Sequence, residues 1–211
     1  MRNILLVAML FFVTSVNAQD NEKKDDVKPE SGFKKEKLFT GGSANLGFSN
    51  YSTVIGITPQ FGYSLTNWAD AGITINVNYS SQRDFREYGD KIRQTIYGPG
   101  AFVRLFPVKF LFASAQYEYN FIKQNYIPAT NSYAPFKGTV NASSLLLGGG
   151  YAGGRERNNN TYYFISVSWD ILGDKNSPYI DGLGRSNPVI RAGYNIGLFQ
   201  GAQRQGGRRM R

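Results

Sequence analysis

Hydrophobic and polar residues alternate along the chain from Leu38 onward, and the alternation is clearest over residues 71–80. The apolar positions of that segment are Ala71, Ile73, Ile75, Val77 and Tyr79, with Gly72, Thr74, Asn76, Asn78 and Ser80 between them. Successive side chains of a β-strand point to opposite faces. A period of two therefore predicts a strand with one apolar face and one polar face.

The same alternation recurs along the chain and predicts eight strands. Their ranges are 38–48, 53–63, 71–80, 95–106, 110–122, 141–151, 162–172 and 188–199. The sixth is the least regular, because Leu145, Leu146 and Leu147 follow one another. Alternating segments of about ten residues, separated by turn residues, are the pattern expected of a transmembrane β-barrel.

The composition of the polar face distinguishes a membrane barrel from a soluble barrel or sandwich. A face in water would carry many Lys and Glu residues, but the polar positions here are mostly Gly, Ser, Thr and Asn. Small uncharged side chains fit the interior of a narrow eight-stranded barrel. Aromatic residues on the apolar face near strand ends suit the membrane interfaces; they are Tyr63, Tyr79, Tyr97, Tyr151 and Trp169. We predict an all-β fold, an eight-stranded antiparallel transmembrane β-barrel over residues 37–199.

The connections between the predicted strands fall into two classes of length. With a periplasmic N-terminus, the outward loops are 50–52, 81–94, 123–140 and 173–187, and the inward turns are 64–70, 107–109 and 152–161. Long outward loops and short inward turns are typical of outer-membrane barrels, and this orientation places Trp68 and Phe110 at the periplasmic rim. The outward loops are polar and aromatic, so they either bind a ligand or lie as solvated surface against anionic lipid headgroups.

The chain outside the predicted barrel has three parts. Residues 1–18 resemble a signal peptide, with Arg2, an apolar stretch from Ile4 to Val13 and a small-residue cleavage pattern ending at Ala18. Residues 19–36 carry mixed charge and few apolar groups, so we expect a disordered linker. The tail 200–211 is basic, and we expect a disordered periplasmic extension. These features predict export to the outer membrane.

Composition removes several kinds of chemistry. The sequence has no Cys and no His, which excludes disulfides, thiolate nucleophiles, His-based metal sites and the Ser-His-Asp triad. The glycine clusters 148–150 and 153–154 lack the Gly-Lys-Ser/Thr of a phosphate loop, and we interpret them as sites of strand curvature and turning. We expect no cofactor and no metal. The net charge of +9 on an exported chain favours outer-membrane lipid and lipopolysaccharide as partners over nucleic acid.

Four charged residues fall on the inward face of the predicted strands and form a candidate lumen charge cluster. They are Arg104, Glu118, Asp170 and Arg191. Buried charges need partners, so the cluster is either a selectivity filter or a plug, and the narrow lumen favours the plug. Asp170 and Arg191 lie on adjacent strands near the outer end, and we predict that they pair. Glu118 with Asp170 as an acid/base pair is disfavoured, because no nucleophile accompanies them.

Several segments resemble the small eight-stranded outer-membrane proteins of Bacteroidetes, which are of the OmpA/OmpX type. The segments that carry the resemblance are 65–72, 106–112, 146–151 and 187–193. The end of the last strand is also similar to a barrel-assembly signal, at Gly193, Ile196, Leu198 and Phe199, although a twelve-residue tail follows. The resemblance implies an outer-membrane location, recognition by the barrel-assembly machinery and membership of a porin-like class of proteins that catalyse no reaction.

Three functions remain for such a barrel. The leading hypothesis is a non-enzymatic protein with a structural or surface-binding role, whose surface ligand the sequence does not identify. The alternative is a narrow porin-like channel for small solutes. A lipid-modifying outer-membrane enzyme is the third, and it is disfavoured because the chain lacks the histidine base that a serine nucleophile commonly uses.

Overall fold

The computed structural model describes residues 32–48, 52–156, 160–180 and 184–199. The signal peptide expected at 1–18, the tail 200–211 and all but the end of the expected linker 19–36 lie outside the described residues. A 3-10 helix, η1 (Lys35–Lys37), precedes the first strand.

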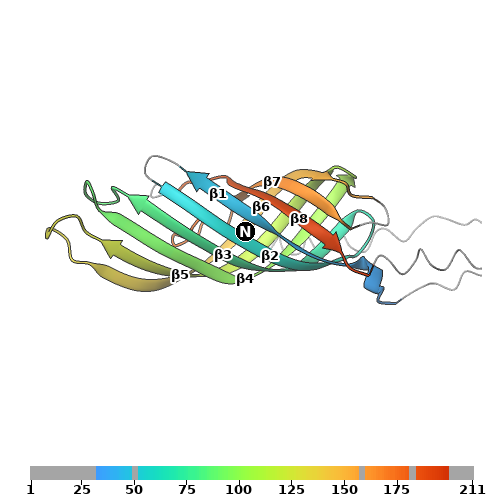
Figure 1. Cartoon of the computed structure of the whole chain (residues 1–211), viewed down its shortest axis with the longest axis horizontal. Helices are drawn as coiled ribbons and strands as arrows, with labels where there is room; N and C mark the ends of the chain where they lie inside the picture. The colour runs from blue at the N-terminus through green and yellow to red at the C-terminus, as the bar shows by residue number, and fades with distance from the viewer. Residues whose placement is uncertain (1–31, 49–51, 157–159, 181–183, 200–211) are drawn as a thin grey trace, which may run out of the picture. The chain divides into compact units, whose positions relative to one another are not determined.

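The described chain forms a closed antiparallel barrel in which every strand pairs with its sequence neighbours and the last pairs with the first (Figure 1). The strands are β1 (Leu38–Phe48), β2 (Ser52–Ser64), β3 (Ala69–Arg83), β4 (Lys91–Val108), β5 (Leu111–Ile127), β6 (Phe136–Gly153), β7 (Tyr162–Asp170) and β8 (Val189–Gly197). The predicted fold class, an eight-stranded antiparallel membrane barrel, is confirmed. Each predicted strand overlaps one of these in order.

The two faces of the barrel have the opposite polarity from those of a water-soluble protein. Ile73 and Ile75 on the outside of β3 are 63% and 58% exposed, whereas Thr74 and Asn76, which alternate with them, are buried. Within the closed part of the barrel the outward face of the other strands is mostly apolar, and the inward face carries many amides, hydroxyls and charged groups. An apolar exterior suits the hydrocarbon of a bilayer, where every backbone N–H and C=O group must also be paired. A closed barrel pairs these groups between its strands.

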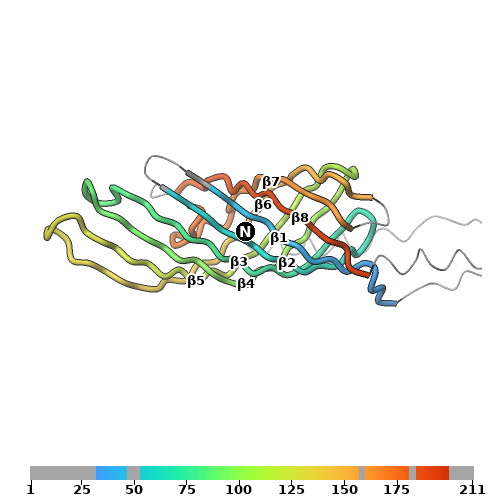
Figure 2. Tube along the Cα trace, in the orientation of Figure 1, coloured from blue at the N-terminus to red at the C-terminus, as the bar shows by residue number. Residues whose placement is uncertain are grey.

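The strands differ in length, and this difference shapes the outer half of the molecule. Strands β4 and β6 have 18 residues each, whereas β7 and β8 have 9. An 18-residue strand reaches about 60 Å, although 9–11 tilted residues suffice to cross a bilayer. The β3–β4 and β5–β6 hairpins therefore project beyond the closed part of the barrel, as the tube shows (Figure 2).

These projections correct two of the predicted loops. Residues 81–83 and 91–94 belong to β3 and β4, and residues 123–127 and 136–140 belong to β5 and β6. The connections themselves are only 84–90 and 128–135. In these segments the outward face becomes polar, with Lys123 and Lys137, while the opposite face keeps the buried Ile92 and Tyr126. The apolar-outside, polar-inside pattern that marks a strand in lipid is therefore lost there.

Glycines of the predicted cluster 148–150 lie where β6 packs tightly against β7. A Cβ added at Gly148 would come 2.0 Å from the carbonyl oxygen of Val167, so no side chain fits there. Gly154, just after β6, has a φ of +85°, which L-residues with side chains rarely adopt. Close strand approach and a turn therefore account for these two glycines.

Candidate functional site

The centre of the lumen is occupied by an ion pair between β5 and β8. A nitrogen of the Arg191 guanidinium lies 2.9 Å from Oε1 of Glu118, and both side chains are almost fully buried. Three further lumen side chains donate hydrogen bonds to the Glu118 carboxylate, at 2.7–3.2 Å: Gln116, Asn76 and Asn120. The carboxylate is therefore neutralised by one cation and also solvated by amides, which is what a buried charge requires.

Tyr179 enters this centre from the connection between β7 and β8. Its hydroxyl donates to Oε2 of Glu118 at 2.6 Å and accepts from Arg191 at 3.3 Å. Its ring packs against Leu146 and Val189 inside the barrel. The β7–β8 connection thus folds into the lumen and supplies a side chain that no strand pattern could place there.

Asp170 stands at the end of β7 and has different partners from those predicted. Its Oδ1 accepts hydrogen bonds from the amides of Leu145 and Leu172, both at 3.0 Å, and its Oδ2 accepts from the Ser177 hydroxyl at 2.5 Å. The carboxylate thus binds an amide of β6 at the level where β7 ends, and it ties down the inward-folded connection.

The predicted pair between Asp170 and Arg191 is therefore wrong. In the register, Arg191 faces Ser166 of β7, so Asp170 lies four residues farther along that strand, a distance of about 13 Å. The Arg191 guanidinium instead reaches across the lumen to Glu118. Adjacency of two strands does not bring two residues together unless their register also matches.

Arg104 is the fourth member of the predicted cluster, and it lies apart from the Glu118–Arg191 pair. Its guanidinium stacks on the rings of Phe164 and Phe102, at 4.4 and 4.7 Å from their centroids. It donates to Oε1 of Gln60 at 2.8 Å and contacts the Tyr162 hydroxyl at 3.4 Å. The structure thus distributes the four predicted residues over three separate sites in the lumen.

Two charged residues outside the predicted cluster complete the half of the lumen that lies away from the projecting hairpins. Arg155, from the β6–β7 connection, pairs with Asp70 of β3 at 2.7 Å, and both side chains are almost fully buried. The Arg155 guanidinium also lies 3.8 Å from the ring centroid of Phe106. Extending the alternation of the third strand back from Gly72 would have placed Asp70 inward, but no periodic signal marks Arg155.

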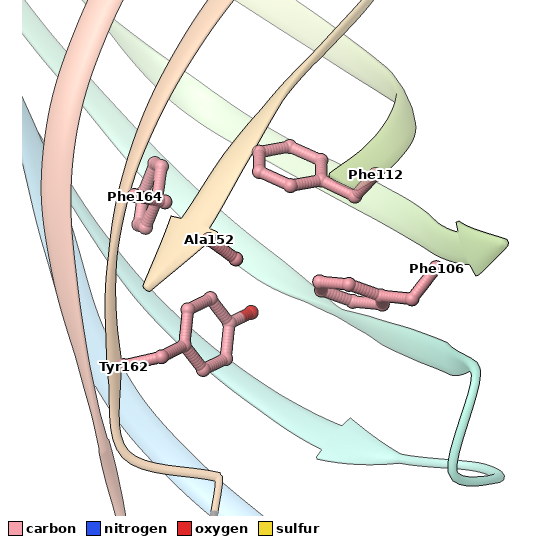
Figure 3. Packing of buried hydrophobic residues seen from close by; sticks show 5 residues of the cluster. All are labelled: Phe106, Phe112, Ala152, Tyr162 and Phe164. Carbon is pink, nitrogen blue, oxygen red and sulfur yellow. The ribbon is translucent and has the colours of Figure 1, made fainter. Parts of the chain in front are cut away.

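Aromatic rings close the same end of the barrel. Phe106, Phe112, Ala152, Tyr162 and Phe164 form a buried cluster inside the lumen (Figure 3). The rings of Phe106 and Tyr162 meet edge to face at 5.9 Å, and those of Phe112 and Phe164 at 6.1 Å. Such rings fill the lumen at low cost in side-chain entropy and form the packed floor on which Arg155 and Arg104 rest.

The space left in the lumen is small at the centre and larger at the outer mouth. The cavity between Arg104, Phe112, Gln116, Leu146 and Arg191 has about 20 Å³, which accommodates about one water molecule. A cavity of about 290 Å³ lies farther out, bounded by Asn45, Asn78, Ile96, Tyr179 and Pro188. The barrel therefore has a vestibule whose lining includes Tyr179, and a packed interior beneath it.

The tips of the two projecting hairpins are ordered by a second acidic centre. Asp90 is fully buried and accepts hydrogen bonds from the Tyr126 hydroxyl at 2.8 Å and from the amides of Phe85, Arg86 and Glu87 at 2.6–3.1 Å. Burial by itself raises the pKa of Asp90, but these four hydrogen bonds favour the carboxylate and hold its pKa below the ordinary value.

The two tips are also bound to each other. The Glu87 carboxylate accepts hydrogen bonds from the amides of Ala129 and Thr130, both at 3.1 Å, and from the Thr130 hydroxyl at 2.8 Å. Arg86 lies over the rings of Tyr126 and Tyr133 at 5.1 and 5.9 Å. The tips of the β3–β4 and β5–β6 hairpins thus form one connected platform.

The residues of the predicted assembly signal lie from the middle of β8 to just after its end. Ile196 faces outward and is half exposed, while Gly193 faces the ring of Phe164 inside the barrel. Leu198 follows the strand and its amide bonds to Leu38, and Phe199 is exposed. Their role in assembly stays a prediction.

The described residues include no group of three or more acidic side chains arranged to hold a metal ion. Among the same residues, no helix is long and apolar enough to cross a membrane.

Comparison with known proteins gives similarity in structure only. No model of a protein family matches the sequence, and no curated protein matches it. The chain is similar to the N-terminal β-barrel domain of Pseudomonas aeruginosa OprF, at 11% identity and a TM-score of 0.43 over 76% of this chain and 98% of that one.

Two further solved structures show a similar level of likeness. Ail of Yersinia pestis, the attachment invasion locus protein, solved with the heparin analogue sucrose octasulfate, has 10% identity and a TM-score of 0.40 over 75% of this chain and 95% of that one. Neisserial surface protein A has 10% identity and a TM-score of 0.38 over 76% and 96%. The fold assignment rests on the strand order and register of this chain itself.

Proposed function

We propose that this chain is a non-enzymatic protein of the outer membrane, with a structural or surface-binding role. The apolar exterior of a closed barrel supports a place in lipid. The N-terminal segment, which resembles a signal peptide, supports export, and the final strand supports recognition by the barrel-assembly machinery. Outer-membrane lipid and lipopolysaccharide are then the immediate partners of the exterior.

The packing of the lumen bears on whether the protein is a structural barrel or a channel. The Glu118–Arg191 pair and the inward-folded Tyr179 meet at its centre, and the cavity between Arg191 and Arg104 has only about 20 Å³. An ion crossing this barrel would have to break a buried ion pair and displace the β7–β8 connection. The plug interpretation is therefore favoured over the narrow channel.

The acidic groups of the lumen also favour a structural role over catalysis. Besides its ion pair with Arg191, the Glu118 carboxylate accepts hydrogen bonds from the side chains of Gln116, Asn76, Asn120 and Tyr179. Asp170 accepts from Ser177 and two backbone amides. Carboxylates that are held in this way have their lone pairs engaged and are poor candidates for general bases.

The projecting hairpins are the part of the molecule best suited to a surface-binding role. Glu87 and Arg86 tie their tips together, so the outward surface is pre-organised, which lowers the entropic cost of binding a partner. A rigid platform above a closed barrel is suited to contact with molecules at the cell surface.

Two measurements test this proposal. The purified protein should need detergent, should show β-type circular dichroism and should migrate differently on gels before and after heating. In planar bilayers it should give no conductance steps under conditions in which a known porin does. Recovery as a soluble monomer would refute the membrane barrel, and regular conductance steps would replace the plug with a channel. Altered lipid A or phospholipid profiles on deletion would instead indicate an enzyme.

A further inference from the structure

The outer face of the projecting strands carries a basic surface that the lumen does not explain. Its cations are Arg93 of β4, Lys123 of β5 and Lys137 of β6. In the register, Arg93 faces Asn125, which in turn faces Lys137. Lys123 lies two residues before Asn125 on the same strand and therefore points to the same face.

These residues form two adjacent rows across the sheet. The outer row is Ser81, Arg93, Asn125 and Lys137, and the inner row is Tyr79, Thr95, Lys123 and Thr139. Neighbouring strands are about 4.8 Å apart and alternate residues about 6.8 Å apart. Three cations thus surround a patch that also presents hydroxyl and amide groups, and the patch lines a shallow groove of about 530 Å³.

No acidic side chain occurs in either row, and none of the three cations forms an ion pair with a described residue. Two carboxylates of the tips above, Glu87 and Asp90, are instead held by the hydroxyls of Thr130 and Tyr126. We refer to Arg93, Lys123 and Lys137, with Thr95, Asn125 and Thr139, as the basic patch.

The position of the basic patch along the barrel indicates what it meets. The next row toward the barrel contains Tyr97 and Phe121, whose rings stack at 5.6 Å, and Phe121 also meets Tyr119 edge to face at 5.3 Å. Lys123 lies over the Tyr97 ring, 5.5 Å from its centroid. Beyond these rings β3 presents Ile75 and Ile73. Aromatic rows mark the membrane interface, so the basic patch lies at the level of lipid headgroups.

We propose that the basic patch binds the phosphate groups of a phosphorylated glycolipid in the outer leaflet, of the lipid A class. Lys and Arg side chains form charge-assisted hydrogen bonds with phosphate oxygens, while Thr95, Asn125 and Thr139 offer partners to sugar hydroxyls. A phospholipid without a sugar headgroup has no sugar hydroxyls to bond to these three side chains. The inference rests on the proposed outer-membrane location, because only there does this level of the barrel face a glycolipid leaflet.

The test titrates the detergent-solubilised full chain with diphosphoryl lipid A and counts bound lipid by native mass spectrometry. The parent should retain lipid A, and Lys123→Gln with Lys137→Gln should weaken binding at least about tenfold, since two charge-assisted contacts are lost. The matched control, Lys109→Gln with Lys175→Gln, removes the same charge from exposed positions outside the patch and should bind like the parent.

Each other outcome overturns the site in a distinct way. Equal weakening in both pairs would mean general charge attraction, and no weakening in the patch pair would place lipid A elsewhere. Phosphatidylglycerol bound as tightly as lipid A would remove the glycolipid preference, and binding of polyglutamate in place of lipid A would indicate an acidic protein partner. The heat-dependent gel shift, recorded on every variant, separates loss of the site from failure of the barrel itself.

Discussion

The lumen is closed at two levels, and the two closures are built differently. At the end away from the projecting hairpins, a cluster of four aromatic rings supports Arg155 and Arg104, with Asp70 as the acidic partner of Arg155. At the centre, Glu118 and Arg191 are surrounded by amides, and Tyr179 enters from a connection. The first closure is packed, whereas the second consists mainly of hydrogen bonds.

This difference bears on how each closure responds to change. Most of the aromatic floor is built from residues of paired strands, so it can open only if the barrel deforms. Tyr179 is held by hydrogen bonds and by Leu146 and Val189, and a connection can move without breaking a strand ladder. The aromatic closure should therefore set the stability of the barrel, and the central closure should set access to its interior.

The largest effect is expected at the packed end. Asp70→Asn leaves Arg155 buried without its anion and weakens the contact from Tyr162. A loss of about 3–5 kcal/mol in unfolding free energy is expected, as for other broken buried pairs. Urea unfolding in detergent measures it. Asp70→Asn combined with Arg155→Gln should cost less than the sum of the two single changes, and strict additivity would show that the pair contributes nothing.

A smaller loss is expected at the centre. Glu118→Gln should lower the unfolding free energy by about 2–4 kcal/mol, because Arg191 keeps its charge but faces only neutral groups. A double-mutant cycle with Arg191→Gln should show coupling. The same cycle between Asp170→Asn and Arg191→Gln should be additive, since these residues do not pair. Coupling between Asp170 and Arg191 would contradict the register of β7 with β8.

The contrast between the two closures also explains what the sequence can and cannot predict. Alternation places Thr74, Asn76 and Glu118 inward, as the structure confirms, because lipid on one side and the lumen on the other impose a strict period of two. Arg155 and Tyr179 come from connections, where side-chain direction follows from turn geometry and not from a repeating pattern. The partner of Arg191 depends on the shear of the barrel, which alternation does not encode.

The inserted tyrosine should give a moderate effect. Tyr179→Phe removes the hydroxyl that donates to Glu118 and should cost about 1–3 kcal/mol, as for a hydrogen bond to a charged group. Tyr194→Phe is the control, because Tyr194 lies on the exterior and is half exposed. Unfolding in urea gives both values. If the two substitutions cost the same, the Tyr179 hydroxyl does not help to close the lumen.

The smallest effect is expected outside the membrane, at the joined tips, and it depends on pH. Burial raises the pKa of Asp90, but hydrogen bonds from Tyr126 and three amides outweigh it and lower the pKa in the folded protein. A carboxyl with a depressed pKa stabilises the fold fully above its unfolded value, near about 3.9, and this contribution disappears as the pH falls through the folded value. Hydrogen exchange of the Phe85, Arg86 and Glu87 amides should therefore accelerate, after correction for intrinsic exchange, only below about pH 4.

In the variant Asp90→Asn, these amides should exchange faster at neutral pH and lose this pH dependence. Protection that is unchanged in Asp90→Asn would mean that the tips are ordered by Glu87 and Arg86 alone.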